Sequence, residues 1–104
     1  MIIMLKKSYS RDNSSCTVTF IMQADQARGV HTAFVSGDFN NWSRTATPMK
    51  KTPEGTFEAK VKLAAGKEFH FRYLIDDEHW DNDWHADKYA QSPFRDAENS
   101  VIIV

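Results

Sequence analysis

The chain has 104 residues, with 13 basic and 14 acidic side chains and a formal net charge of −1. This length corresponds to about one small domain, which excludes a multidomain enzyme. The balanced charge argues against a nucleic-acid-binding protein, because such domains are normally basic. Aromatic residues make up 12% of the chain, and a domain of this size has limited interior to hold them. Some aromatic side chains are therefore expected to have a role other than packing.

The cysteine content and the N-terminal residues indicate the cellular compartment in which the protein is expected. Cys16 is the only cysteine in the sequence, so neither an intramolecular disulfide nor a thiolate metal cluster can form. The apolar run at 1–5 is too short for a signal peptide, and lysines follow it rather than precede it. No stretch approaches the roughly 18 apolar residues of a membrane span. We therefore expect a cytoplasmic protein that does not bind membranes.

Alternation of apolar and polar residues, the pattern of a half-buried β-strand, recurs along the chain. It begins at 16–22, is followed by a β-rich run at 30–36, and is clearest at 57–63 and 69–75. The tail at 101–104 predicts a last strand, and no window has convincing helical spacing of apolar residues. The aromatic residues expected to fill the core are Phe20, Phe34, Phe57, Phe69, Phe71 and Tyr73.

These strands, with turns at a spacing of roughly ten residues, predict an all-β, two-sheet antiparallel sandwich. We expect a single domain over 1–104, in which 1–12 is a loosely attached leading segment. Two segments, 38–47 and 81–99, are too irregular for strands and are rich in Trp, Asn and Asp. Loops tend to carry function, so these two segments are the candidate regions for a site.

The motif Gly-Asp-Phe-Asn-Asn-Trp at 37–42 begins one residue before the first irregular segment and continues into it. This motif resembles that of the glycogen-binding and isoamylase N-terminal early-set modules, also called family-48 carbohydrate-binding modules. The family includes the module on β-subunits of AMP-activated protein kinase. The resemblance covers nearly the whole chain and is closest to the small stand-alone bacterial type, in which no catalytic domain follows. It continues through 48–51, 55–57, 71–76, Trp80, 82–83 and 98–101.

The resemblance implies an immunoglobulin-like antiparallel β-sandwich of about seven strands that binds α-1,4-glucan, as glycogen or starch-like polysaccharide or as maltooligosaccharides. A pyranose ring has apolar C–H faces and a rim of hydroxyl groups. An exposed indole face suits the first, and Arg or Asn side chains suit the second. The binding residues that the resemblance implies are Trp42, Arg72, Trp80 and Asn99.

The position of Trp80 depends on the register of one hairpin. A three-residue loop at 76–78 pairs Leu74 with Trp80 and puts Trp80 on the outward face, where Arg72 also lies. A two-residue loop would instead put Trp80 opposite Ile75, on the core face. We favour the first register, because the resemblance implies that this tryptophan lies at the binding surface.

The sequence departs from the family pattern in the hairpin loop and in the loop at 92–97. Asp77 stands in the hairpin loop where a glycine is common, which leaves the turn type open. Arg95, in the loop at 92–97, stands where kinase-subunit relatives have an apolar residue that contacts the glucan, so we expect a reduced affinity. Trp84 is interpreted as a packing residue rather than a binding residue.

Catalysis and metal binding are not expected. A glycosidase needs two carboxylates held at a set separation, whereas the aspartates here lie in short loops of a small domain, so we predict that the chain is not an enzyme. His79 and His85 flank Asp81 and Asp83, but the spacing matches neither a zinc site nor a calcium loop. We therefore predict no metal ion and no cofactor.

Two alternatives to glucan binding stay open. The outward face could dock on a partner protein, such as a separately encoded glucan-metabolising enzyme or a kinase, with weak or no sugar binding. The chain could also be a degenerate module that retains the fold alone.

Overall fold

The fold was analysed in a computed structural model that describes residues 5–83, 86–91 and 98–104. Almost all the regular structure is β, and in these ranges no helix is long and apolar enough to cross a membrane. The strands are β1 (Leu5–Tyr9), β2 (Ser15–Met22), β3 (Ala33–Gly37), β4 (Lys50–Lys51), β5 (Phe57–Ala64), β6 (Glu68–Ile75), β7 (His79–Asp81), β8 (Lys88–Gln91) and β9 (Glu98–Ile103), with a helical turn α1 (Ala24–Ala27) and a 3-10 turn η1 (Asp38–Asn40).

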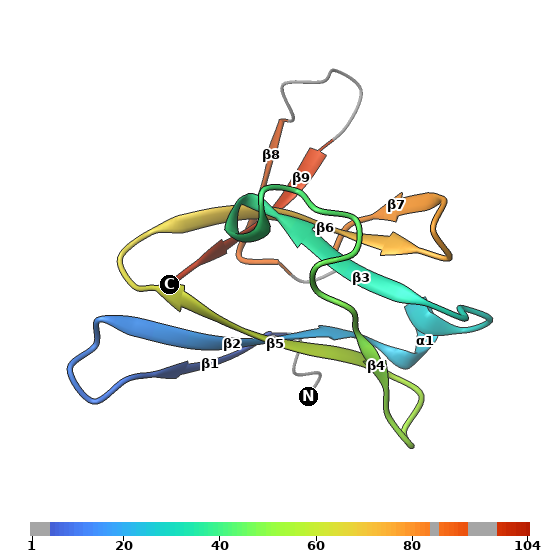
Figure 1. The fold of residues 1–104 in the computed structure, drawn as a ribbon, viewed down its shortest axis with the longest axis horizontal. Helices are drawn as coiled ribbons and strands as arrows, with labels where there is room; N and C mark the ends of the chain where they lie inside the picture. Colours follow the sequence, from blue (N-terminus) through green and yellow to red (C-terminus); the bar gives the residue numbers. More distant parts are fainter. Residues whose placement is uncertain (1–4, 84–85, 92–97) are drawn as a thin grey trace.

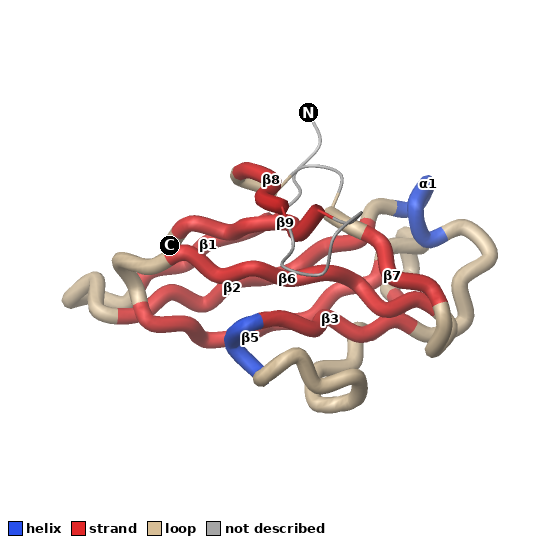
Figure 2. Tube along the Cα trace, turned by 90° about the horizontal axis from the view of Figure 1, so that it is seen from above, coloured by secondary structure: helices blue, strands red, loops and turns tan. Residues whose placement is uncertain are grey.

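The strands form two antiparallel sheets that lie face to face as two layers (Figure 1). One sheet has the order β1-β2-β5-β4 and the other the order β3-β6-β9-β8, with β7 also paired to β6. In the second sheet, β6 lies between β3 on one side and β7 and β9 on the other (Figure 2). The predicted immunoglobulin-like sandwich is confirmed. The described residues contain nine strands rather than about seven. Three of them, β4, β7 and β8, have only two to four residues each.

The strand β8 lies where none was predicted. The segment 81–99 was expected to be irregular, but β8 pairs with β9 from Lys88, opposite Val101, to Gln91, opposite Glu98. The sequence Lys-Tyr-Ala-Gln of β8 has no apolar alternation, and three of its four residues are exposed at the sheet edge. Backbone pairing with β9, rather than burial of side chains, holds this strand in place.

The core follows the predicted alternation. Cys16, Val18, Phe20 and Met22 are completely buried on β2. The ring of Phe71 on β6 packs edge-on against Phe20, at 4.8 Å between centroids, and the two sheets therefore meet through aromatic contacts. Cys16 is a free, buried thiol, as expected of a small apolar residue in a core.

The prediction that Phe34 fills the core is wrong. Ala33 and Val35 face the core and are 2% and 0% exposed, so the strand turns Phe34 to the opposite face, where it pairs with Leu74. The run at 30–36 is apolar at three adjacent positions, Ala33, Phe34 and Val35, so alternation alone does not decide whether Phe34 or its two neighbours point inward. The pairing of β3 with β6 decides it.

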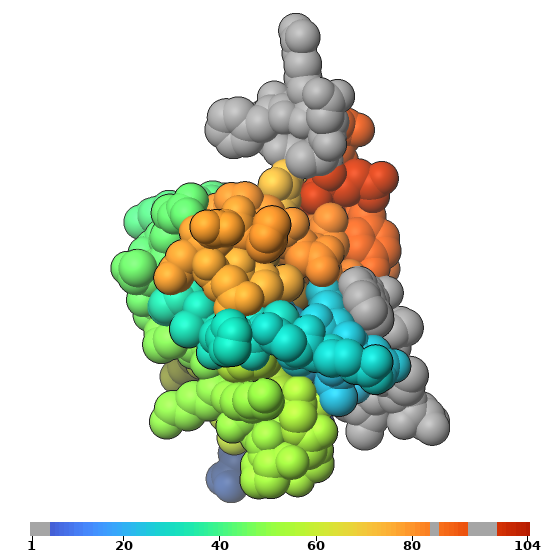
Figure 3. All heavy atoms as spheres, turned by 90° about the vertical axis from the view of Figure 1, so that its right-hand side faces the viewer, coloured from blue at the N-terminus to red at the C-terminus, as the bar shows by residue number. Residues whose placement is uncertain are grey.

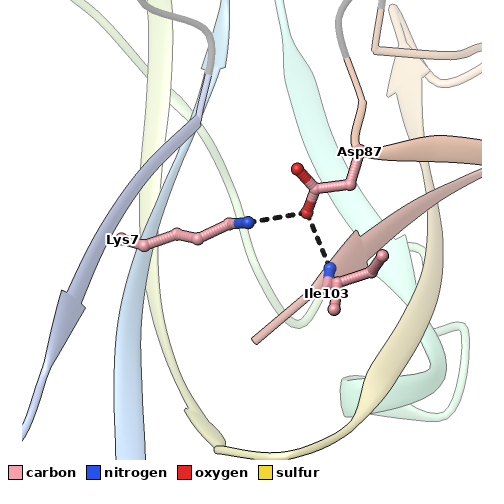
Figure 4. Close-up of polar contacts among 3 residues, drawn as sticks. All are labelled: Lys7, Asp87 and Ile103. Atoms are coloured by element: carbon pink, nitrogen blue, oxygen red, sulfur yellow. Dashed lines mark hydrogen bonds and ion pairs between the residues drawn. The ribbon is translucent and has the colours of Figure 1, made fainter.

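The leading segment contributes a strand. Within 1–12, which we expected to be loosely attached, β1 pairs with β2 from Leu5, opposite Phe20, to Tyr9, opposite Cys16. The ammonium group of Lys7 on β1 lies 2.7 Å from the Oδ2 atom of Asp87, which also accepts a hydrogen bond from the N–H of Ile103 at 2.7 Å (Figure 4). Asp87 thereby links β1 of one sheet to β9 of the other.

A buried polar network fixes the segment that follows β7. The hydroxyl of Tyr73 donates a hydrogen bond to the carboxylate of Asp83 at 2.5 Å, and both side chains are inaccessible to solvent. The N–H of Asp83 donates to the Ser100 hydroxyl on β9 at 2.9 Å, and the hydroxyl of Tyr89 donates to the carbonyl of Asp83 at 2.6 Å. This network holds the chain after β7 against β6 and β9.

Candidate functional site

The loop after β3 begins where two strands come unusually close. A Cβ atom at Gly37 would collide with the carbonyl oxygen of His70 and would lie 2.8 Å from the Cβ atom of Phe71. Only glycine permits this approach of β3 to β6. The first residue of the Gly-Asp-Phe-Asn-Asn-Trp motif is therefore explained by backbone packing.

Asp38 and Phe39 anchor the loop to the sheet. The Oδ2 atom of Asp38 accepts a hydrogen bond from the backbone N–H of His70 at 2.8 Å, and its Oδ1 atom accepts one from the indole N–H of Trp42 at 3.0 Å. The ring of Phe39 stacks on the core residue Phe20 at 5.3 Å between centroids. The loop is thus held by one carboxylate and one aromatic ring.

Asn40 closes the loop on itself. Its Oδ1 atom accepts a hydrogen bond from the N–H of Gly37, and its Nδ2 atom donates to the carbonyl of Val35 and to the hydroxyl of Thr47, each at 3.0 Å. Asn41 and Trp42 follow with φ values of 57° and 58°. This left-handed conformation is one that asparagine tolerates better than most residues.

The local geometry limits how Trp42 can meet a ligand. Its side chain is half-buried, and its only hydrogen-bond donor is engaged by Asp38. In this conformation Trp42 can offer a ligand the apolar surface of its ring but no polar contact.

The hairpin between β6 and β7 has the predicted three-residue loop. Leu74 pairs with Trp80 and Ile75 pairs with His79, so the register that puts Trp80 on the outward face is confirmed. Asp76 and Asp77 occupy the turn with φ values of 51° and 63°, and they adopt the left-handed region without a glycine. The Oδ1 atom of Asp76 accepts hydrogen bonds from the N–H groups of His31 and Thr32, at 2.8 and 2.9 Å. These contacts support the strained turn.

The bonds to His31 and Thr32 also affect the protonation of Asp76. The two backbone N–H groups hold the pKa of this carboxyl below its usual range, because they stabilise the charged form. Asp76 therefore stays ionised and keeps the hairpin loop tied to the start of β3.

Arg72 and Asn99 meet on the outward face of the second sheet. The Nε–H group of Arg72 donates a hydrogen bond to the Oδ1 atom of Asn99 at 2.7 Å, and the Nδ2 atom of Asn99 lies 3.1 Å from the Nδ1 atom of His70. Asn99 is only 4% exposed, and partial burial lowers the pKa of Arg72. Ser36 lies beside Arg72 on β3, and its buried hydroxyl has no hydrogen-bond partner among the described residues.

Arg44 belongs to this surface, although the sequence analysis did not select it. Its Nη2 atom donates a hydrogen bond to the carbonyl of Asp77 at 2.8 Å, and its guanidinium carbon lies over the Trp80 ring, 5.6 Å from the centroid. Figure 3 shows the green atoms of the loop after β3 adjoining the orange atoms of the β6–β7 hairpin. Residues 47–49 after this loop pair with the edge of β3 that faces away from β6. Because Trp80 lies on β7, beyond β6, the contact with its ring carries the Arg44 side chain across β6. Leu74 lies on the outward face of β6 and is nevertheless 1% exposed.

The structure therefore joins three of the four predicted residues on one sheet face and places the fourth beside it. Arg72, Trp80 and Asn99 lie on adjacent strands of the second sheet, and Trp42 lies two residues before Arg44 in the neighbouring loop. Arg95 and Trp84 lie outside the described residues. Within the described ranges, no group of three or more His, Cys, Asp or Glu side chains could hold a metal ion.

The fold and this surface define a small immunoglobulin-like binding module, in which two tryptophans and a set of polar side chains lie on and beside one sheet. The sequence model of the family described as the glycogen recognition site of AMP-activated protein kinase matches residues 20–101. The chain belongs to this family of carbohydrate-binding modules. Modules of this kind are not catalytic, which fits the prediction that the chain is not an enzyme. Comparison with curated proteins finds no match.

Proposed function

We propose that the chain is a non-catalytic, cytoplasmic module that binds α-1,4-glucan chains through Trp42, Arg72, Trp80 and Asn99. Membership of a glycogen-recognition family supports this proposal. The observation that carries it is the pairing of Leu74 with Trp80, because that register places an indole ring on the same sheet face as the Arg72–Asn99 pair.

The side chains offer both kinds of contact that a glucan needs. Trp80 is 38% exposed, an unusual value for a tryptophan, and can cover the apolar face of one pyranose. Arg72 uses its Nε–H group on Asn99. Its terminal nitrogen atoms, which have no hydrogen-bond partner within the described part of the chain, can donate to sugar hydroxyl groups.

The expected affinity is modest. Covering half of an indole removes ~60–80 Å² of apolar surface, worth ~1.5–2 kcal/mol. Two such contacts and a few solvent-exposed hydrogen bonds, less the cost of ordering the sugar, give a Kd of roughly millimolar to tens of micromolar. Binding to a branched polysaccharide would then depend on many chain ends presented together.

Electrophoresis in native gels with and without glycogen tests the proposal. We expect glycogen to retard the wild-type protein, and Trp42→Ala and Trp80→Ala each to bind about tenfold more weakly, as the loss of one stacking contact predicts. Tyr9→Ala is the matched control, because Tyr9 is an exposed aromatic residue, 46% accessible, on the other sheet.

Two outcomes would contradict this proposal in different ways. Wild-type mobility that high glycogen concentrations leave unchanged would exclude glucan binding and favour docking on a partner protein such as a glucan-metabolising enzyme. Normal retardation of both tryptophan variants would keep the function but reject the site.

A further inference from the structure

His70 contacts the candidate site through a side chain that the sequence analysis did not consider. His70 and Arg72 occupy alternate positions of β6 and point to the same face, and Asn99 lies beside them on β9. The amide group of Asn99 is held between the two, with Arg72 Nε at 2.7 Å from its oxygen and His70 Nδ1 at 3.1 Å from its nitrogen.

The hydrogen-bonding capacity of these groups determines their orientation. The Nε–H group of Arg72 can only donate, so the amide atom that faces it must be the oxygen of Asn99. The NH₂ group of Asn99 then faces His70, whose Nδ1 atom must accept. His70 therefore completes the arrangement only as the neutral tautomer that carries its proton on Nε2.

Proton uptake by His70 breaks this arrangement. An imidazolium has N–H groups at both nitrogen atoms, so Nδ1–H would oppose the NH₂ group of Asn99 and no acceptor would be left between them. Turning the Asn99 amide over would satisfy His70 but would place NH₂ against the Nε–H of Arg72. The new positive charge would also repel the guanidinium of Arg72.

In the described part of the chain, the carboxylates near His70 are engaged with other groups. Glu68 on β6 pairs with Lys88 on β8 at 2.8 Å. Asp38 in η1 uses its two carboxylate oxygens on the indole of Trp42 and on the backbone N–H of His70. Both carboxylates are thus engaged with other groups, and Arg72 on the same strand already places one positive charge on this face.

We propose that neutral His70 is a positioning residue of the glucan site. It fixes the Asn99 amide, which in turn fixes the Arg72 guanidinium, so glucan affinity falls when His70 takes up a proton. This inference rests on the proposed function.

The binding test compares maltoheptaose affinity at pH 7.5 and pH 5.5 by calorimetry. We expect the wild-type protein to bind about fivefold more weakly at the lower pH, as the loss of one hydrogen bond predicts. His70→Gln should bind as wild type at pH 7.5 and keep that affinity at pH 5.5, because its amide oxygen accepts from Asn99 at both values. His79→Gln, the control in the adjacent strand β7, should lose affinity at low pH as the wild-type protein does.

A second measurement needs no sugar. In ¹⁵N NMR spectra, the Arg72 Nε–H and Asn99 side-chain signals should shift with a common midpoint as pH falls, and this shift should be absent from His70→Gln. Wild-type affinity that is equal at both pH values, or an equal loss in His70→Gln, would overturn the proposal. If no maltoheptaose binds at either pH, the proposed function fails, and the NMR titration still decides whether His70 holds Asn99 and Arg72.

Discussion

The guanidinium of Arg44 lies over the indole ring of Trp80, with its central carbon 5.6 Å from the ring centroid. The same guanidinium donates a hydrogen bond to the carbonyl of Asp77, so one side chain connects the loop that carries Trp42 to the hairpin that carries Trp80. In this conformation Arg44 occupies one face of the ring on which we propose that a sugar stacks.

Replacing Arg44 should therefore change affinity. A cation–π contact at an exposed site contributes about 0.5–1 kcal/mol, which a stacking pyranose on this face must displace. We expect Arg44→Ala to bind maltoheptaose about twofold to fivefold more tightly, measured by calorimetry. Arg28→Ala is the control, because Arg28 is exposed and only pairs loosely with Asp25 in α1. Weaker binding by Arg44→Ala would contradict the prediction and make Arg44 a direct contact of the sugar.

Loss of the negative charge of Asp38 should destabilise the folded protein. Its two oxygen atoms each accept an N–H, from His70 and from Trp42, whereas an asparagine in the same place has one accepting atom. We expect Asp38→Asn to lower the free energy of unfolding by about 1 kcal/mol, measured by urea denaturation. Asp25→Asn, in an exposed helical turn, serves as the control. Equal stability of Asp38→Asn and wild type would show that the carboxylate does not anchor the loop.

Substitutions of two adjacent residues at the end of β3 should have different effects on the free energy of unfolding. Gly37→Ala places a Cβ atom against the backbone of β6, and we expect it to reduce the free energy of unfolding by about 3 kcal/mol. Ser36→Ala removes a buried hydroxyl that has no hydrogen-bond partner in the described ranges of the chain, and we expect no change or a gain of about 1 kcal/mol. Urea denaturation of both variants measures the difference. A loss of stability in Ser36→Ala would mean that the hydroxyl is satisfied in solution.

The buried Tyr73–Asp83 pair should make stability fall at high pH. Burial and the adjacent charge of Asp83 raise the pKa of the Tyr73 phenol well above its ordinary value. The unfolded chain releases this proton near about pH 10, while the folded chain retains it, so the contribution of Tyr73 is full below that pH and declines above it. Urea denaturation between pH 7 and pH 11 should show that the advantage of wild type over Tyr73→Phe shrinks at the alkaline end. A constant difference across that range would contradict this prediction.

The parts of the fold that the sequence predicts are those where a local pattern coincides with burial. The alternation over β2, β5 and β6 places Phe20, Phe57 and Phe71 in the core correctly, because alternate side chains of each strand point between the two sheets. The same rule fails at Phe34 and Val35, which are both apolar, and at β8, which buries too little for alternation to develop. In those places the pairing partner decides, and it is distant in sequence.

The residues of the candidate site also divide into those that could be selected from the sequence and those that could not. The length of the hairpin loop decides whether Trp80 faces outward, and the family resemblance rather than the local sequence selected the three-residue loop that the structure has. Arg44 and His70 could not be selected in this way, because their contacts with Trp80 and Asn99 cross strands that are far apart in the chain. An arginine two residues after Trp42 is the only local signal, and it does not reveal the hairpin that it reaches.

The two-layer arrangement has a practical consequence for measuring polysaccharide binding. Three of the four residues of the proposed site lie on the sheet that contains β6, whereas Lys62 is exposed on the outward face of the opposite sheet. The chain has one cysteine, Cys16, and it is fully buried. A Lys62→Cys variant would therefore carry a single accessible thiol, and coupling through it would immobilise every molecule with the same side toward a large, branched glucan.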